Sequence, residues 1–289
     1  MHNPFHRFTK KQWIIVISVM ILLPLLFFAT DSRLLIRSYT VASEKIENPI
    51  RLVLITDLHS CYYGKNQETL LSAVEAQNPD LVLFSGDIFD ENRDHTNALV
   101  LLSSLAKQYP CAYVSGNHEV WCGEVDYTRL MTQLQTEYGI TVLHGDTVTV
   151  EINGTPVNLC GMDDPDAYTM GVGGGTQNTF SEQLQQLSEK VQTDSFTILL
   201  SHRPEYFETD YCGGAYDLVL SGHAHGGQVR IPGILNGLYA PHQGLFPPYA
   251  GGMYTKDGTA MIVSRGLARE TTIVPRVFNR PELVVIDLT

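Results

Sequence analysis

The sequence predicts an α/β fold of stacked β-sheets covered by helices, preceded by one transmembrane helix. From Asn48 onward, short β-rich apolar runs alternate with amphipathic helical stretches, the rhythm of sheets whose strands are joined by helices. Each predicted strand ends at a polar cluster, where open α/β sheets place their ligands. The stretch from Trp13 to Ala29 contains no charged residue, as expected for a segment that spans a membrane.

This apolar stretch divides the chain. It lies near the lower limit for crossing a hydrocarbon core of ~30 Å, and its flanking residues as far as Ile36 lengthen it. We therefore expect a tail over 1–12, a transmembrane anchor over 13–36, a linker over 37–47 and one domain over 48–289. A cleaved signal peptide is the alternative, but it would have a shorter apolar region and an A-x-A-like cleavage site.

Positive charges beside the span bear on its orientation. Arg7, Lys10 and Lys11 precede it, and Arg33 and Arg37 follow it. Under the positive-inside rule this small excess favours a cytoplasmic N-terminal tail. We expect a single-pass protein of the cell membrane with the domain over 48–289 on the extracytoplasmic side, and the alternative is a domain on the cytoplasmic face.

The elements of the domain follow in order. Helices are predicted around 70–74, 99–105 and 184–191. A β-hairpin is predicted over 147–159, because Asn153-Gly154 suits the positive φ angles of a type I′ turn. The Gly-rich stretches 163–179 and 231–252 are predicted loops. The remaining strands are predicted at 52–55, 81–84, 112–114, 196–200, 218–220, 260–263 and 283–286.

The acidic composition bears on partners. The formal net charge is −12, whereas nucleic-acid binding relies on clustered Lys and Arg that displace counterions from phosphates. We expect no nucleic-acid partner. Affinity for a phosphate group must come from a local feature such as a metal ion.

Five polar clusters directly follow predicted strands. A single D-x-H pair or strand-end histidine is usually a capping or solvated residue. Five clusters in order, with carboxylate, amide and imidazole groups and no thiolate, favour a site for divalent cations. The clusters are Asp57-Leu58-His59, Gly86-Asp87, Gly116-Asn117-His118-Glu119, Ser201-His202 and Gly222-His223-Ala224-His225.

The clusters resemble the signature of the calcineurin-like metallophosphoesterases: D-x-H, G-D-x-x-D, G-N-H-[ED], H and G-H-x-H. The second element is Gly86-Asp87-Ile88-Phe89-Asp90. The resemblance extends from Asn48 to the C-terminus, and motifs such as Val263-Ser264-Arg265-Gly266-Leu267 are similar to the membrane-linked bacterial branch with YkuE-like proteins. It implies a four-layer αββα sandwich, with two mixed β-sheets flanked by helices.

The resemblance also implies roles for single residues. His118 would act as general acid or charge stabiliser. Asp90 would either orient an imidazole such as that of His118 or cap its own loop. Asp87 would bridge two metal ions, since a carboxylate has two oxygens and a charge that reduces repulsion between cations. The implied ligands of one metal are Asp57, His59 and His225, and those of the other are Asn117, His202 and His223.

The implied function is hydrolysis of a phosphoester or pyrophosphate bond by water that two divalent ions activate as hydroxide. Mn²⁺ is our first expectation, and Fe, Zn²⁺ and Mg²⁺ also suit mixed nitrogen and oxygen ligands. The substrate would be a phosphorylated small molecule, phosphodiester or lipid-linked compound, and a membrane tether favours a lipid-linked or envelope-associated one. A protein-binding scaffold is the alternative, although retention of all seven ligands and His118 argues against it.

Further basic residues are candidates for substrate contact. His242 lies in a Gly- and Pro-rich loop that would border the site, whereas His95 and His144 have no predicted role. Arg230 and Arg265 would contact a phosphate or headgroup, or pair with one of the many acidic residues.

Overall fold

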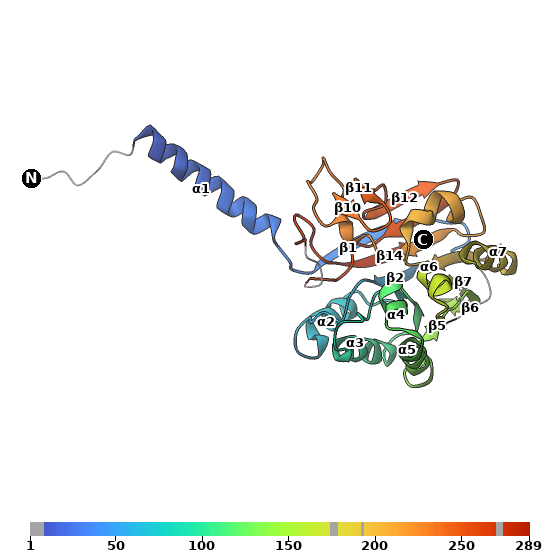
Figure 1. Ribbon diagram of the computed structural model, residues 1–289. Coiled ribbons are helices and arrows are strands. Elements are labelled where there is room, and N and C mark those ends of the chain that lie inside the picture. Colours follow the sequence, from blue (N-terminus) through green and yellow to red (C-terminus); the bar gives the residue numbers. More distant parts are fainter. Residues whose placement is uncertain (1–8, 174–178, 192–193, 270–273) are drawn as a thin grey trace, which may run out of the picture.

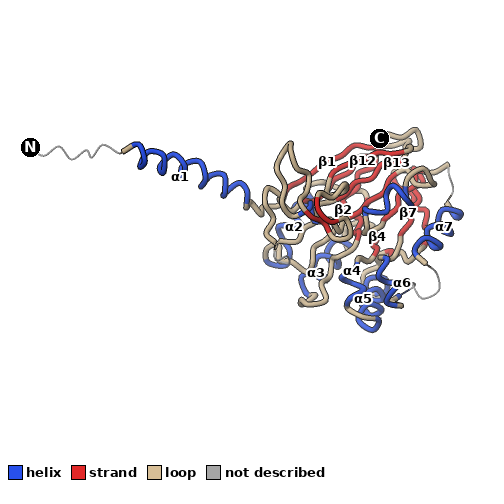
Figure 2. Tube along the Cα trace, turned by 45° about the horizontal axis from the view of Figure 1, so that its top comes forward, coloured by secondary structure: helices blue, strands red, loops and turns tan. Residues whose placement is uncertain are grey.

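The structure is a computed structural model that describes residues 9–173, 179–191, 194–269 and 274–289. Helix α1 (Lys10–Ala29) projects from a domain in which two β-sheets are flanked by helices (Figures 1 and 2). The predicted architecture of two mixed sheets flanked by helices is confirmed.

The first sheet has the strand order β1-β14-β2-β3-β4-β5. Its β14 and β2 are antiparallel, and its other neighbours are parallel. The strands are β1 (Leu35–Val41), β14 (Glu282–Leu288), β2 (Ile50–Ile55), β3 (Leu81–Ser85), β4 (Cys111–Val114) and β5 (Thr141–Val142).

The second sheet has the order β12-β13-β9-β8-β7-β6, with antiparallel pairs at both ends and parallel pairs between them. Its last pair is the predicted hairpin, in which Asn153 and Gly154 have φ of 53° and 81°. A small sheet joins β10 (Tyr239–Ala240) to β11 (Gly244–Leu245). The strands are β12 (Gly252–Lys256), β13 (Thr259–Val263), β9 (Leu218–Ser221), β8 (Phe196–Leu200), β7 (Thr155–Gly161) and β6 (Asp146–Ile152).

Apolar side chains fill three layers. Alternate residues of β2 point to opposite faces, so Leu52 and Leu54 pack between the sheets while Val53 and Ile55 pack in the layer that holds the helices of the first sheet. A third layer packs the second sheet against α7. Because both faces of the central strands are buried, their sequences are continuously apolar. The helices are α2 (Glu68–Glu75), α3 (Thr96–Ala106), α4 (Asn117–Trp121), α5 (Glu124–Thr136), α6 (Pro165–Met170) and α7 (Phe180–Lys190).

Two predicted boundaries are wrong. Residues 37–41 of the linker expected over 37–47 belong to strand β1, which pairs with β14 along its whole length. The α1 helix ends at Ala29 and not at Ile36. The loop expected over 163–179 contains α6, which begins where the Asp164 side chain accepts from the Asp166 amide and Pro165 occupies the first turn. Residues 174–178 of that loop lie outside the described residues.

Helix α1 is exposed along its length except at its last residue, Ala29. Its first turn is capped by Thr9 and Gln12, whose side chains each accept a hydrogen bond from the other residue's backbone amide. Among the described residues, α1 is the one helix that is both long enough and apolar enough to cross a membrane. An N-terminal signal sequence has the same properties.

Candidate metal centre

The predicted ligands meet at the carboxyl ends of strands from both sheets. Asp57 and His59 follow β2, and Asp87 follows β3. Two contacts bring the sheets' loops together: the His223 amide donates to Asp57 Oδ1 over 2.9 Å, and His202 Nδ1 donates to the Ser85 carbonyl over 2.8 Å. The other predicted ligands are Asn117, which begins α4, and His225, which follows β9.

The backbone at these loops is strained. Five of the predicted ligands have φ between 46° and 66°. This left-handed backbone conformation is uncommon for residues other than Gly. Such conformations persist where the surrounding structure fixes them, commonly at functional sites. The chain passes so close to Asp87 that a Cβ at Gly116 would lie 2.3 Å from Asp87 Oδ1. The five ligands are Asp57, His59, Asp87, His223 and His225.

The side chains form two clusters that share Asp87. In each cluster every residue offers a ligand atom within 4.8 Å of the others. Asp87 Oδ2 lies 3.6 Å from His59 Nε2 in the first cluster and 3.0 Å from His202 Nε2 in the second. The first cluster is Asp57, His59, Asp87 and His225, and the second is Asp87, His202 and His223.

Several buried polar atoms at this site have no hydrogen-bond partner. They are His59 Nε2, Asn117 Oδ1, His202 Nε2 and His225 Nδ1. A buried polar atom without a partner is costly, and imidazole nitrogen and amide oxygen are ligands of divalent cations. The donor set of the two clusters therefore fits two such ions.

Burial and neighbouring charges set the protonation of these groups. Burial holds the pKa of His223 and His225 well below the usual range, so both imidazoles are neutral, the form that binds metal. Burial opposes charge on Asp87 and His202 as well. Their mutual attraction outweighs it, lowering the pKa of Asp87 well below its usual value and raising that of His202 to about 10.

His118 borders the clusters without joining either. Its side chain is 22% exposed, enough to reach a substrate, and its Nδ1 donates to Glu91 Oε2 over 2.6 Å. Asp90 was expected to orient an imidazole such as that of His118 or to cap its own loop. Its Oδ2 contacts the imidazole of His59 at 3.2 Å and lies 3.9 Å from that of His118, and its Oδ1 accepts a hydrogen bond from the Asn92 amide over 3.0 Å. Burial would lower the pKa of His118, but the carboxylates of Asp87 and Glu91 raise it.

A buried carboxylate holds the loop that carries Asp87. Glu119 accepts hydrogen bonds from four backbone amides and from the hydroxyl of Tyr113, at 2.7 to 2.9 Å. Two of these amides belong to Asp87 and Gly116, so one side chain joins the loops after β3 and β4. The other two amides are those of Ile88 and Phe89.

A buried arginine lies beside the second cluster. Arg203 forms a bidentate ion pair with Asp164, at 2.6 and 2.8 Å. Its Nη1 also lies 2.6 Å from His242 Nδ1 and 3.3 Å from His223 Nε2. The structure thus places His242 at the edge of the site, as expected from its loop, and adds Arg203.

Sequence reasoning assigned no role to Glu91, Glu119 or Arg203. Glu119 is itself the last residue of the G-N-H-[ED] element, whereas Glu91 and Arg203 directly follow Asp90 and His202; these positions were the only signal in the sequence. Arg230 and Arg265, in contrast, lie outside the clusters and line a separate pocket. His95 and His144 contact Asp90 and Asp163 and belong to neither cluster.

Comparison with known proteins identifies the family. The family model for calcineurin-like phosphoesterases matches residues 50–227, a segment that contains both clusters. The chain belongs to the calcineurin-like phosphoesterase family. It is therefore a metal-dependent hydrolase of phosphoric esters, and the fold of this family uses a dinuclear centre of divalent metal ions.

Relatives of this calcineurin-like phosphoesterase occur in several bacteria. YkuE of Bacillus subtilis, an uncharacterized metallophosphoesterase, is 30% identical over 82% of this chain and 78% of its own length. An uncharacterized metallophosphoesterase of Helicobacter pylori strain J99 is 28% identical over 83% of this chain, and the match spans 60% of that relative. The crystal structure of a dimetal phosphatase from Danio rerio shares the fold, with a TM-score of 0.51 and 16% identity over 76% of this chain and 88% of that one.

Proposed function

We propose that this calcineurin-like phosphoesterase is a membrane-anchored enzyme that hydrolyses a phosphoester or pyrophosphate bond of a lipid-linked or envelope-associated substrate, with Mn²⁺ as its metal. Asp87, shared between two buried clusters, is the observation that carries the proposal. Asp57, His59 and His225 would hold one metal, and Asn117, His202 and His223 the other. Asp87 would contribute to both sites.

Two divalent ions at such a site supply an activated water and bind the phosphoryl oxygens. The chain's own residues complete the reaction. The Asp87 carboxylate offsets the repulsion between two cations, and Glu119 fixes its loop. The carboxylates of Asp87 and Glu91 raise the pKa of His118 and so favour its imidazolium form, which carries a proton on Nε2 as well as the one that Nδ1 donates to Glu91. His118 donates the Nε2 proton to the leaving oxygen as general acid.

Helix α1 supports a substrate at the membrane. Only residues 30–34 separate α1 from β1, and the Phe278 amide donates to the Ala29 carbonyl over 2.7 Å. The domain is therefore held against the end of the helix, within about 20 Å if those five residues are extended. On this arrangement the N-terminal tail is cytoplasmic and the domain extracytoplasmic, following the excess of positive charge before the span.

Full-length protein, purified in detergent and stripped of metal, is the material for the test. It is assayed with Mn²⁺, Fe²⁺, Zn²⁺ or Mg²⁺ on mono- and bis-nitrophenyl phosphate, and on a pyrophosphate-linked lipid beside its water-soluble analogue. We expect turnover that depends on the metal, with Mn²⁺ most active, and faster turnover of the lipid-linked compound. No turnover with any metal would support a scaffold instead, and equal rates on the two pyrophosphates would remove the lipid preference.

Two variants separate metal binding from proton donation. Asp87→Asn should lose bound metal and lower kcat by about 100-fold or more, since it removes the charge between the cations. His118→Asn should keep its metal and lower kcat by about 100-fold or more. Metal content is measured by plasma mass spectrometry. Asp126→Asn, on the exposed surface of α5, is the control and should match the unmodified chain; normal activity of Asp87→Asn would refute the shared carboxylate.

A further inference from the structure

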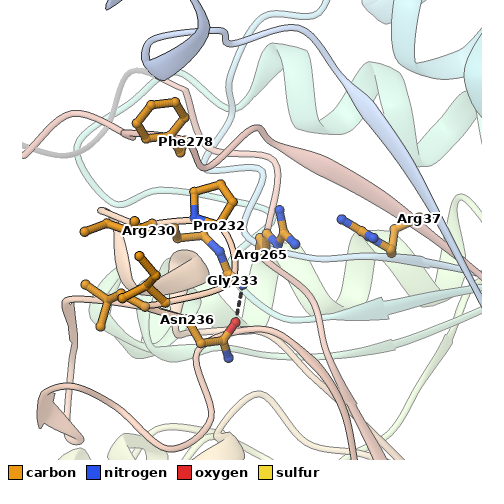
Figure 3. Close-up of a pocket in the computed structure, with 10 residues that line it drawn as sticks. Arg37, Arg230, Pro232, Gly233, Asn236, Arg265 and Phe278 are labelled. Atoms are coloured by element: carbon orange, nitrogen blue, oxygen red, sulfur yellow. Dashed lines mark hydrogen bonds between the residues drawn. The ribbon is translucent and has the colours of Figure 1, made fainter. Parts of the chain in front are cut away.

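A cationic pocket lies apart from the two metal clusters, with a volume of about 530 Å³. Three arginines from distant parts of the chain line it: Arg37 of β1, Arg230 after the His225 loop and Arg265 after β13 (Figure 3). Its other lining residues include Asn236, Ile231 and Ile234. In a chain with net charge −12, this is a local concentration of positive charge.

One acidic side chain faces these arginines. The buried Glu282 lies 3.3 Å from Arg265 Nε and 3.9 Å from Arg37 Nε, and neither nitrogen has a hydrogen-bond partner. Among the described residues Arg230 forms no ion pair with an acidic side chain; it donates to the Gly226 carbonyl and to Asn236, as Figure 3 shows for the latter. Three positive groups thus face one carboxylate.

This excess of charge is partly shielded from water. Burial, together with the nearby charge of Arg265, lowers the pKa of Arg230 to about 10. A ligand that compensates this charge needs a negative group of the size of a phosphate. It also needs oxygen acceptors for the guanidinium N–H groups that have no hydrogen-bond partner. A phosphate group has both.

The pocket adjoins the end of α1. Its lining residue Phe278 donates its amide to the carbonyl of Ala29, the last residue of that helix. Apolar side chains of its lining are exposed, with Ile234 83% and Ile231 45% exposed. Exposed apolar side chains beside basic ones are typical of surfaces that enter the headgroup region of a bilayer.

We propose that the pocket of Arg37, Arg230 and Arg265 binds the phosphate group of an anionic membrane lipid while Ile231 and Ile234 enter the bilayer interface. The site is separate from the metal clusters and requires no hydrolysis. It goes beyond the proposed activity and rests only on the placement of α1 at the membrane. Bound lipid would fix the orientation of the domain on the bilayer.

Native mass spectrometry of the full-length chain in detergent, with EDTA present to prevent turnover, tests this proposal. The probes are phosphatidylglycerol, phosphatidylcholine and diacylglycerol with the same acyl chains, and glycerol 1-phosphate as a soluble competitor. We expect phosphatidylglycerol to bind roughly tenfold more tightly than diacylglycerol, and phosphatidylcholine to lie between them because its choline cation meets the arginines. Glycerol 1-phosphate should compete weakly, since it lacks acyl chains.

Arg230→Gln and Arg265→Gln should each lower the affinity for phosphatidylglycerol roughly tenfold, and Arg230→Lys should lose less. Arg129→Gln, on the exposed face of α5, is the matched control and should have no effect. An unchanged melting temperature (Tm) of Arg230→Gln separates lost binding from misfolding.

Two results would overturn the lipid site: equal binding of phosphatidylglycerol by Arg230→Gln and Arg129→Gln, or equal binding of diacylglycerol and phosphatidylglycerol. Competition by glycerol 1-phosphate as strong as that by the lipid would make this a site for soluble phosphate esters. Because the assay contains EDTA, its outcome does not depend on phosphoesterase activity, and loss of activity in Asp87→Asn leaves it unaffected.

Discussion

Glu119 shows how one residue prepares a metal site before any metal binds. Five donors point at its two oxygens, and the side chain is fully buried. A carboxylate is suited to this position because it only accepts hydrogen bonds and its charge strengthens each of them. The left-handed conformation of Asp87 is therefore maintained by Glu119 from behind the loop.

Replacing this carboxylate by an amide tests the idea. Glu119→Gln keeps the size of the side chain, but its NH₂ group would face backbone N–H donors and leave them without an acceptor. We expect a loss of about 2–4 kcal/mol in the free energy of unfolding, a decrease in Tm on the order of 10 °C, and less bound metal. Glu47→Gln, at an exposed position, is the control, and a Tm equal to that of this control would contradict the role of Glu119.

At the residue scale, order and chemistry along the chain were enough to predict which side chains come together. Strands of an α/β sheet end at a common edge, so motifs directly after strands converge whatever the helices between them do. The contacts within each loop were not predictable. Asp90 and Glu91 are adjacent, and the turn after Asp87 decides which of them reaches His118.

Strand β1 is one of the elements that sequence reasoning missed, together with α5, β5 and β12. Its alternate residues Leu35, Arg37, Tyr39 and Val41 are more buried than those between them, which is the period of a strand. Arg37 interrupts the apolar face of this pattern because it lines the arginine pocket. A charged side chain in the apolar face thus concealed the strand pattern, and the preceding apolar helix placed the predicted boundary after Leu35.

The pairing of β1 with β14 predicts where the chain can be shortened. A chain beginning at Asp31 keeps all seven residue pairs of this ladder and the Asp31–Arg280 contact at 3.4 Å. A chain beginning at Asn48 leaves β14 as an unpaired edge, which favours aggregation. Without detergent, we expect the longer chain to elute as a compact species in size-exclusion chromatography. The shorter one should aggregate or melt at lower temperature, and equal behaviour of the two would show that β1 is dispensable.

At the scale of the whole molecule, the layers and the metal centre were predictable because they repeat one rule, an apolar strand followed by a polar loop. The arginine pocket follows no such rule. Arg37, Arg230 and Arg265 are brought together only when β1 joins β14 and β13 joins the second sheet. Two of the three were recognised as candidates for phosphate contact, but their common pocket depends on a strand that was not predicted.

Whether α1 is retained or cleaved decides whether the mature protein is anchored in the membrane. The helix has 20 residues, about 30 Å at 1.5 Å per residue, which matches a hydrocarbon core. Cleavage after Ala29 would cut the chain at a residue that is buried and hydrogen-bonded to Phe278. We therefore expect an intact mass that includes α1, and a protein that stays in the membrane pellet after extraction at alkaline pH. The chain beginning at Asp31 is the control and should be soluble; a mature chain that begins at Thr30 and is released by this extraction would identify α1 as a signal peptide.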